Sequence, residues 1–186
     1  MTAILDLPTV KSRTHLLSIE EYHALGKLGF LSKRTELIEG VVLQKMPKSP
    51  KHATMVKKIF QFFMKSLPQG CHVISEQPIT LSRSEPEPDI SVISGTIEDY
   101  SESHPTTAEL VIEVSLSTLA EDREMANIYA EALIPEYWLF NLNNSTVEVY
   151  IKPRNGRYSE MKTYSKSETV IPKFDDSLKV SLENLF

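Results

Sequence analysis

The stretch Glu109-Leu110-Val111-Ile112-Glu113-Val114-Ser115 carries apolar side chains on both faces of an extended chain, around one internal carboxylate, Glu113. A strand of this kind is typical of the centre of a sheet that is covered on each side. Amphipathic helices are predicted before and after it, at about residues 52–66 and 119–133, because apolar residues recur there at spacings of three and four. The sequence therefore predicts a buried central strand with helices on either side of it along the chain.

Two capping boxes predict where helices begin. Ser18 with Glu21 begins a short helix, and Thr118 with Glu121 begins the helix at about residues 119–133. Short strands, two pairs of which form hairpins, are predicted from alternating apolar residues and turn residues at 36–38 with 41–46, 71–75, 78–82, 88–93, 136–142 with 146–152, and 158–164. Residues 1–14 are expected to form a loose leader, and residues 15–186 a single domain.

Composition excludes several classes of protein. The chain has 186 residues with 20 Lys+Arg and 25 Asp+Glu, a net charge of −5 at pH 7. No apolar run reaches the roughly 18 residues of a membrane-spanning helix, and the first residues lack the pattern of a signal peptide. Cys71 is the only cysteine, which excludes disulfides within the chain and zinc clusters of several thiolates. We therefore expect a cytoplasmic protein that does not enter membranes, and homo-oligomerisation is left open.

Charge is unevenly distributed along the chain. Residues 44–65 contain six lysines and no acid, whereas residues 85–124 contain eleven acids and one arginine. Such a division can hold a polyanion at one site and gather metal-binding carboxylates at another. Two solvated faces of opposite sign are the alternative. In the first interpretation, nucleic-acid phosphates are bound by Lys45, Lys48, Lys51, Lys57 and Lys58.

Glu113 and Asp89 are the candidate metal ligands. A carboxylate buried in an apolar strand is costly unless a cation or strong donors meet it, so Glu113 needs either a core Arg or Lys or a metal ion. Asp89 lies in another predicted strand, and two adjacent strands can bring both carboxylates to one edge of the sheet. There they can share a hard cation such as Mg²⁺, with the Val114 carbonyl as a third ligand. Bound in this way, the ion would polarise a phosphate and lower the pKa of its water.

Five segments occur in a characteristic order along the chain: Glu36-Leu37-Ile38-Glu39-Gly40; Met46-Pro47 with His52; Pro88-Asp89-Ile90; Leu110-Val111-Ile112-Glu113-Val114-Ser115; and Tyr129-Ala130 with Ile134-Pro135-Glu136-Tyr137-Trp138. In this order and spacing they resemble the Uma-two family of restriction-endonuclease-like proteins, within the PD-(D/E)XK nuclease superfamily. The resemblance covers roughly residues 15–186. It implies an α/β (mixed α+β) restriction-endonuclease-like fold, with a mixed central sheet flanked by helices and additional antiparallel hairpins.

The resemblance also implies a site that hydrolyses DNA phosphodiester bonds with Mg²⁺, or with Mn²⁺ as the alternative ion. By this match Asp89 and Glu113 are the metal ligands. Glu36 corresponds to the acid of the first motif and His52 to a histidine that recurs in the family. All four are therefore candidate catalytic residues.

One residue that the resemblance implies is missing. The family supplies a lysine from the helix that follows Glu113, and this position holds Met125 or Ala126, depending on the register. Losing a positioned acid–base partner costs about 10²–10⁴ in rate, so impaired catalysis is predicted. The candidates to replace the lysine are Arg123, Lys45 and the lysines between residues 48 and 58.

The sequence thus supports a metal-dependent endonuclease that acts on DNA. The alternative is a catalytically inactive nuclease-fold protein that binds nucleic acid or a protein partner. A carboxylate-pair hydrolase acting on a small phosphorylated or glycosidic substrate is a third hypothesis.

Overall fold

A computed structural model describes Ile4 and residues 7–186. The contacts within it divide the chain into two compact units. The N-terminal unit comprises the described residues up to Lys45 together with Arg83–Glu85, and the larger unit comprises Met46–Ser82 with Pro86–Phe186. The single domain predicted over residues 15–186 includes residues of both units and stays a prediction.

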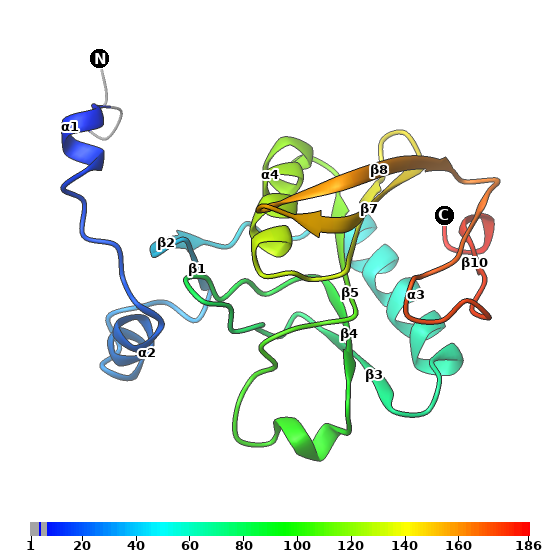
Figure 1. The fold of residues 1–186 in the computed structure, drawn as a ribbon, viewed down its shortest axis with the longest axis horizontal. Helices are drawn as coiled ribbons and strands as arrows, with labels where there is room; N and C mark the ends of the chain where they lie inside the picture. Colours follow the sequence, from blue (N-terminus) through cyan, green and yellow to red (C-terminus); the bar gives the residue numbers. More distant parts are fainter. Residues whose placement is uncertain (1–3, 5–6) are drawn as a thin grey trace. The chain divides into compact units, whose positions relative to one another are not determined.

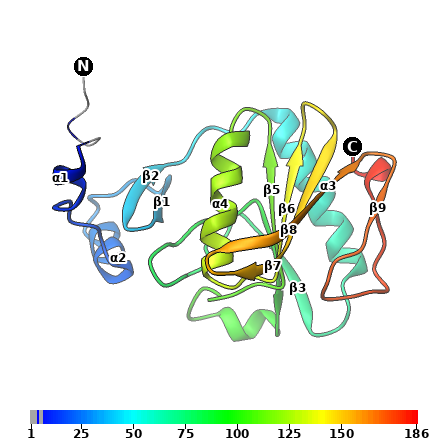
Figure 2. The same ribbon diagram turned by 45° about the horizontal axis from the view of Figure 1, so that its top comes forward.

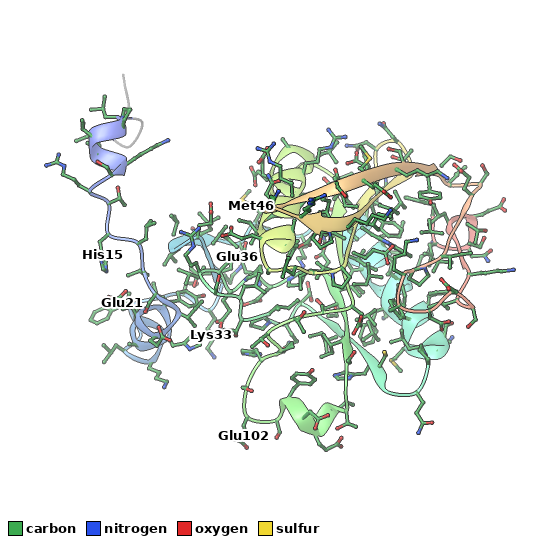
Figure 3. The ribbon with its side chains drawn as sticks, in the orientation of Figure 1. His15, Glu21, Lys33, Glu36, Met46 and Glu102 are labelled. Carbon is green, nitrogen blue, oxygen red and sulfur yellow. The ribbon has the colours of Figure 1, made fainter. Side chains whose placement is uncertain are left out.

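The N-terminal unit contains α1 (Pro8–Lys11), α2 (Ile19–Lys27) and a hairpin of β1 (Thr35–Ile38) with β2 (Val41–Gln44) (Figure 1). α1 lies within the predicted leader, of which residues 1–3 and 5–6 fall outside the described residues. α2 begins at the predicted capping box, because the side chains of Ser18 and Glu21 each accept a hydrogen bond from the other's amide. His15 also contacts Glu21, at 3.2 Å (Figure 3).

A mixed sheet forms the centre of the larger unit, in the order β3-β4-β5-β6-β7-β8. Its strands are β3 (Cys71–Ser75), β4 (Ile90–Ser94), β5 (Leu110–Ser115), β6 (Glu136–Asn141), β7 (Thr146–Arg154) and β8 (Arg157–Ser165). β5 and β6 pair in parallel, and the other neighbours pair antiparallel. A parallel pair needs a crossover connection, which contains α4 (Leu119–Glu131).

Helices cover opposite faces of this sheet (Figures 1 and 2). The apolar stripe of α3 (Pro50–Ser66) packs in one core cluster with Ile112 and its neighbours. Tyr129 of α4 packs in a second cluster with Val111. Because successive residues of a strand point to alternate faces, Glu113 lies on the α4 face of β5.

Shorter elements complete the larger unit: η2 (Ile97–Tyr100), β9 (Thr169–Val170), β10 (Val180–Ser181) and η3 (Leu182–Asn184). Within the described part of the chain, no helix is long and apolar enough to cross a membrane. The predicted mixed α+β fold, with a central mixed sheet, flanking helices and antiparallel hairpins, is confirmed.

The strand predicted at residues 78–82 is wrong. This segment joins no sheet. The Ile79 amide donates instead to the Pro86 carbonyl at 3.0 Å, and the Thr80 amide donates to the Pro105 carbonyl at 2.9 Å. The alternating pattern therefore marks a buried connection whose amides bond to loops rather than to a neighbouring strand.

Candidate active site

The pairing of β4 with β5 brings Asp89 and Glu113 together. Ile90 lies opposite Ile112 in this antiparallel pair, so the register places Asp89 opposite Glu113, one residue beyond. The Val114 amide donates a hydrogen bond to Asp89 Oδ2 at 2.8 Å, and the Asp89 amide donates one to Glu113 Oε2 at 3.1 Å. Each carboxylate is thus held by a backbone amide of the other segment.

Glu113 has a further donor on the α4 face of the sheet. The hydroxyl of the fully buried Tyr129 donates to Glu113 Oε1 at 3.0 Å. Burial, followed by the negative charges of Asp89 and Asp122, raises the pKa of Glu113 well above its usual range. A carboxylate perturbed in this way by neighbouring acids is a candidate for cation binding, because a cation favours its charged form.

Asp89 is surrounded by groups that favour its charged form. Its side chain is 5% exposed; Lys48 Nζ lies 2.5 Å from Oδ1, and His52 Nε2 lies 3.0 Å from Oδ2. Burial opposes ionisation, but the hydrogen bond with His52 and the charge of Lys48 outweigh it and lower the pKa of Asp89. Burial also disfavours the charge of Lys48, yet Asp89 and Glu76 together raise the pKa of Lys48 to about 12.

The start of α3 positions Lys48 and His52. Ser49 caps the helix, since its hydroxyl accepts a hydrogen bond from the His52 amide at 3.2 Å. Pro50 is tolerated in the first turn because the amide that it lacks would have no partner there. Lys48 therefore lies just before the helix and His52 within its first turn, and both side chains contact Asp89.

Glu76, which follows β3, is the second partner of Lys48. Its Oε1 lies 2.6 Å from Lys48 Nζ. Its backbone has a φ of 55°, a left-handed conformation that is uncommon for residues other than glycine. Its amide is 3.2 Å from the Pro88 carbonyl and 3.3 Å from the Asp89 carbonyl. These contacts tie the end of β3 to the segment that carries Asp89.

Asp122 adds a carboxylate from the first turn of α4. The Thr118 hydroxyl donates to Asp122 Oδ2 at 2.7 Å and makes no capping bond, so the capping box predicted for Thr118 and Glu121 is wrong. Burial raises the pKa of Asp122. The hydrogen bond from Thr118 lowers this pKa, and the negative charge of Asp89 raises it further. Nothing in the sequence sets Asp122 apart, because an acid in the first turn of a helix needs no further explanation.

Glu36 and Lys45 belong to the N-terminal unit. Glu36 lies on β1 opposite Leu43 of β2 (Figure 3). The amide of Lys45 donates to the Arg34 carbonyl at 2.8 Å. The predicted place of Glu36 beside Asp89 and Glu113, and the binding of phosphate by Lys45, therefore stay predictions.

The other predicted phosphate-binding lysines lie on α3 in different environments. Lys51 Nζ donates to the Leu142 carbonyl and Lys58 Nζ to the Leu185 carbonyl, both at 2.9 Å. Lys57 is exposed. The lysine-rich segment is thus not one uniform surface, and its binding of nucleic acid stays a prediction.

Among the candidates to replace the missing lysine, Arg123 is committed to another partner. Its Nε donates to Glu148 Oε2 of β7 at 3.1 Å, and its Nη2 donates to Oε1 of the same side chain. Met125 and the buried Ala126 pack in the second core cluster. Lys48 is the candidate that the structure places on Asp89.

The oxygens of Asp89 and Glu113 suit a hard cation. Mg²⁺ prefers oxygen ligands and commonly keeps several waters, so one or two carboxylates can supply its protein ligands. Each oxygen of Glu113 accepts one of the hydrogen bonds above, and Asp89 Oδ1 accepts from Lys48. In the described part of the chain, no group of three or more His, Cys, Asp or Glu has the arrangement of a metal site. Asp89 and Glu113 are therefore the residues that would hold the ion.

Comparison with known proteins identifies a family for the chain and a solved structure with a similar fold. The family model Uma2, described as "putative restriction endonuclease", matches residues 19–182. A solved structure from Anabaena variabilis ATCC 29413, described as "a putative nuclease belonging to DUF820", is similar with a TM-score of 0.76 and 20% sequence identity, covering 91% of this chain and 97% of that chain. A likeness at this identity concerns the fold. No curated protein matches this chain.

Proposed function

Since the chain belongs to the Uma2 family, described as "putative restriction endonuclease", we propose that it is a nuclease that hydrolyses DNA phosphodiester bonds with a divalent metal ion, Mg²⁺ or Mn²⁺. The resemblance stated from the sequence is thereby confirmed at the level of the family. One observation carries the proposal: Asp89 and Glu113 each accept a backbone hydrogen bond from the other's segment. Two acids fixed in this way are preorganised for one ligand, because their positions do not depend on flexible side chains alone.

In this proposal Asp89 and Glu113 hold the ion, with the Val114 carbonyl as an additional oxygen ligand. When bound, the ion supplies a Lewis acid that polarises the scissile phosphate and lowers the pKa of a water molecule. The chain's own groups fix the carboxylates: the Val114 amide holds Asp89, and the Tyr129 hydroxyl holds Glu113. His52 is a candidate to contact a DNA phosphate, since it opens α3 beside Asp89.

Lysines of the 44–65 segment would hold neighbouring phosphates. Lys57 is exposed on α3, so its ammonium can meet a phosphate without breaking an internal contact. Lys51 and Lys58 each contact a backbone carbonyl. An ammonium has three donors, so each of these two side chains retains donors for phosphate.

A second candidate function is DNA binding without cleavage. The positions that the family resemblance assigns to a lysine, Met125 or Ala126, pack in a hydrophobic core cluster. Neither position therefore supplies a basic group to Glu113, and the α4 side chains that affect it are Tyr129 and Asp122. A nuclease fold with this change would bind nucleic acid and hydrolyse it slowly or not at all.

Supercoiled plasmid nicking tests the proposal. The wild-type chain should nick slowly in MgCl₂ or MnCl₂ and stop when the metal is chelated, whereas Asp89→Asn and Glu113→Gln should lose nicking. Glu109→Gln is the matched control, because Glu109 precedes the same strand and contacts Ser94 instead of the site. Metal-independent nicking, or equal nicking by all variants, would contradict the proposal. Retained DNA binding without any nicking would favour the second candidate.

A further inference from the structure

The two oxygens of Asp89 differ in how much room they leave for a ligand. Oδ2 meets the Val114 amide at 2.8 Å and His52 Nε2 at 3.0 Å, which uses both of its lone pairs. Oδ1 meets Lys48 Nζ at 2.5 Å. A divalent ion that binds Asp89 must therefore approach through Oδ1, the oxygen to which the ammonium is bound.

Lys48 is held there from two sides. Its Nζ lies 2.5 Å from Asp89 Oδ1 and 2.6 Å from Glu76 Oε1. The ammonium thus bridges two carboxylates, as a small cation would. Glu76 has the strained left-handed backbone described above, and such conformations concentrate at functional sites.

We propose that the Lys48 ammonium is a resident counter-cation of the active site, and that a divalent metal ion binds Asp89 by displacing it. This inference rests on the proposed function in one respect, the role of Asp89 as a metal ligand. An ammonium and a divalent ion on one carboxylate oxygen would lie within a few ångströms of each other, where like charges repel strongly. The side chains of Lys48 and Glu76 are 32% and 52% exposed, so Lys48 can swing toward solvent while Glu76 remains its partner.

Displacement predicts a change in the chemical reactivity of Lys48. Limited acetylation of the folded wild-type chain, read by peptide mass spectrometry with and without MgCl₂ or MnCl₂, should show at least a several-fold rise in labelling of Lys48 when metal is added. Lys65, which is exposed at the other end of α3, should not change. Asp89→Asn should label strongly at Lys48 with or without metal.

Displacement also predicts a change in metal affinity that needs no substrate. Titration calorimetry with MnCl₂ should give a dissociation constant about tenfold lower for Lys48→Met than for wild type, and an unchanged one for Lys65→Met. Unchanged or weaker binding by a folded Lys48→Met variant would overturn the inference. If that variant does not fold, labelling of the wild-type chain decides alone.

The outcomes separate this inference from the proposed function. If Mn²⁺ binds but Lys48 labelling stays constant or falls, Lys48 remains beside the ion, and displacement is wrong while the metal site stands. If Mn²⁺ binds Lys48→Met and not the wild-type chain, the ion does not displace the ammonium, and displacement is wrong while the metal site stands. If neither chain binds Mn²⁺, both the inference and the metal-dependent function fail.

Discussion

Met125 lies one helical turn before Tyr129, whose hydroxyl donates to Glu113. A lysine at position 125 can therefore direct its ammonium toward the α4 face of β5. We predict that Met125→Lys gains metal-dependent plasmid nicking over the wild-type chain. Met125 is only partly buried, so the charge can be accommodated at modest cost. Nicking rates at fixed MnCl₂ concentration measure the gain.

Ala126→Lys is the contrasting variant, because Ala126 is 5% exposed in the core cluster. It should lose stability by about 1–3 kcal/mol from overpacking alone, which urea unfolding can measure. Asp89→Asn in the Met125→Lys background should abolish the gain. A Met125→Lys variant that binds Mn²⁺ and DNA but still does not nick would show that the missing lysine is not what limits catalysis.

Single residues also show which parts of the candidate site could be predicted from the sequence. Glu113 could be singled out because a carboxylate inside an apolar strand needs a partner. Its partners could not be identified, since Tyr129 has the spacing of an ordinary core residue. Lys48 likewise looked like one member of a basic segment. Its contact with Asp89 spans 41 residues of sequence and depends on where α3 begins.

At the scale of elements, the β1–β2 hairpin depends on Gly40. Its φ is +78°, and a Cβ added there would lie 2.7 Å from Leu16 Cβ and 3.0 Å from the Leu17 carbonyl oxygen. Gly40→Ala should lower the opening free energy of the hairpin amides by about 1–3 kcal/mol, measured by native-state hydrogen exchange. Gly26→Ala is the control, because nothing lies within 4 Å of its added Cβ. That change lies in α2 and should be neutral or stabilising by about 0.5–1 kcal/mol. Equal effects of the two substitutions would contradict the dependence of the hairpin on Gly40.

The Arg123–Glu148 pair joins α4 to β7, and it predicts that the free energy of unfolding depends on pH. Burial opposes ionisation of Glu148, but Arg123 and Tyr150 outweigh it and lower its pKa from 4.5. A lowered folded-state pKa contributes stability above the unfolded-state value, and this is lost as the pH falls through the folded-state value. Glu148→Gln should therefore cost about 1–3 kcal/mol at neutral pH, and the difference from wild type should narrow as the pH falls below the unfolded-state value.

Urea unfolding of wild type and Glu148→Gln across this pH range measures how the difference between their free energies of unfolding narrows. The matched control is Glu160→Gln, since Glu160 and Lys152 form a pair whose side chains are 51% and 64% exposed. An exposed pair contributes at most about 1 kcal/mol. If the difference in free energy of unfolding between wild type and Glu148→Gln stays constant with pH, the Arg123–Glu148 pair contributes through packing rather than charge.

The elements themselves were predicted unevenly, for physical reasons. The Glu39-Gly40 turn and the Ser18 capping box are local, so neighbouring residues determine them. Residues 78–82 have the alternation of a strand, but pairing needs a partner edge, and the amides of Ile79 and Thr80 meet proline carbonyls instead. Alternation reports burial of one side of the segment, whereas sheet membership depends on residues far away in the sequence.

For the molecule as a whole, the sequence showed opposite charges in two segments but not how each charge is used. Lys48 is bound to Asp89, and Lys51 and Lys58 contact backbone carbonyls. Side-chain contacts of this kind cannot be derived from a count of charges. Fewer lysines of the 44–65 segment are therefore without an internal contact than the charge of the segment suggests. The net charge of the whole chain is −5.

This distribution predicts modest DNA affinity that falls as the salt concentration rises, because phosphate contacts release counterions. Lys57→Glu should weaken binding and reduce the slope of log K against log[salt] by about one, since it removes one exposed phosphate contact. Fluorescence anisotropy with a labelled duplex at several NaCl concentrations measures both quantities. Lys166→Glu, an equal change of charge in the exposed turn after β8, should have a much smaller effect. Equal losses from the two variants would show that DNA responds to the net charge of the protein and that α3 is only a solvated face.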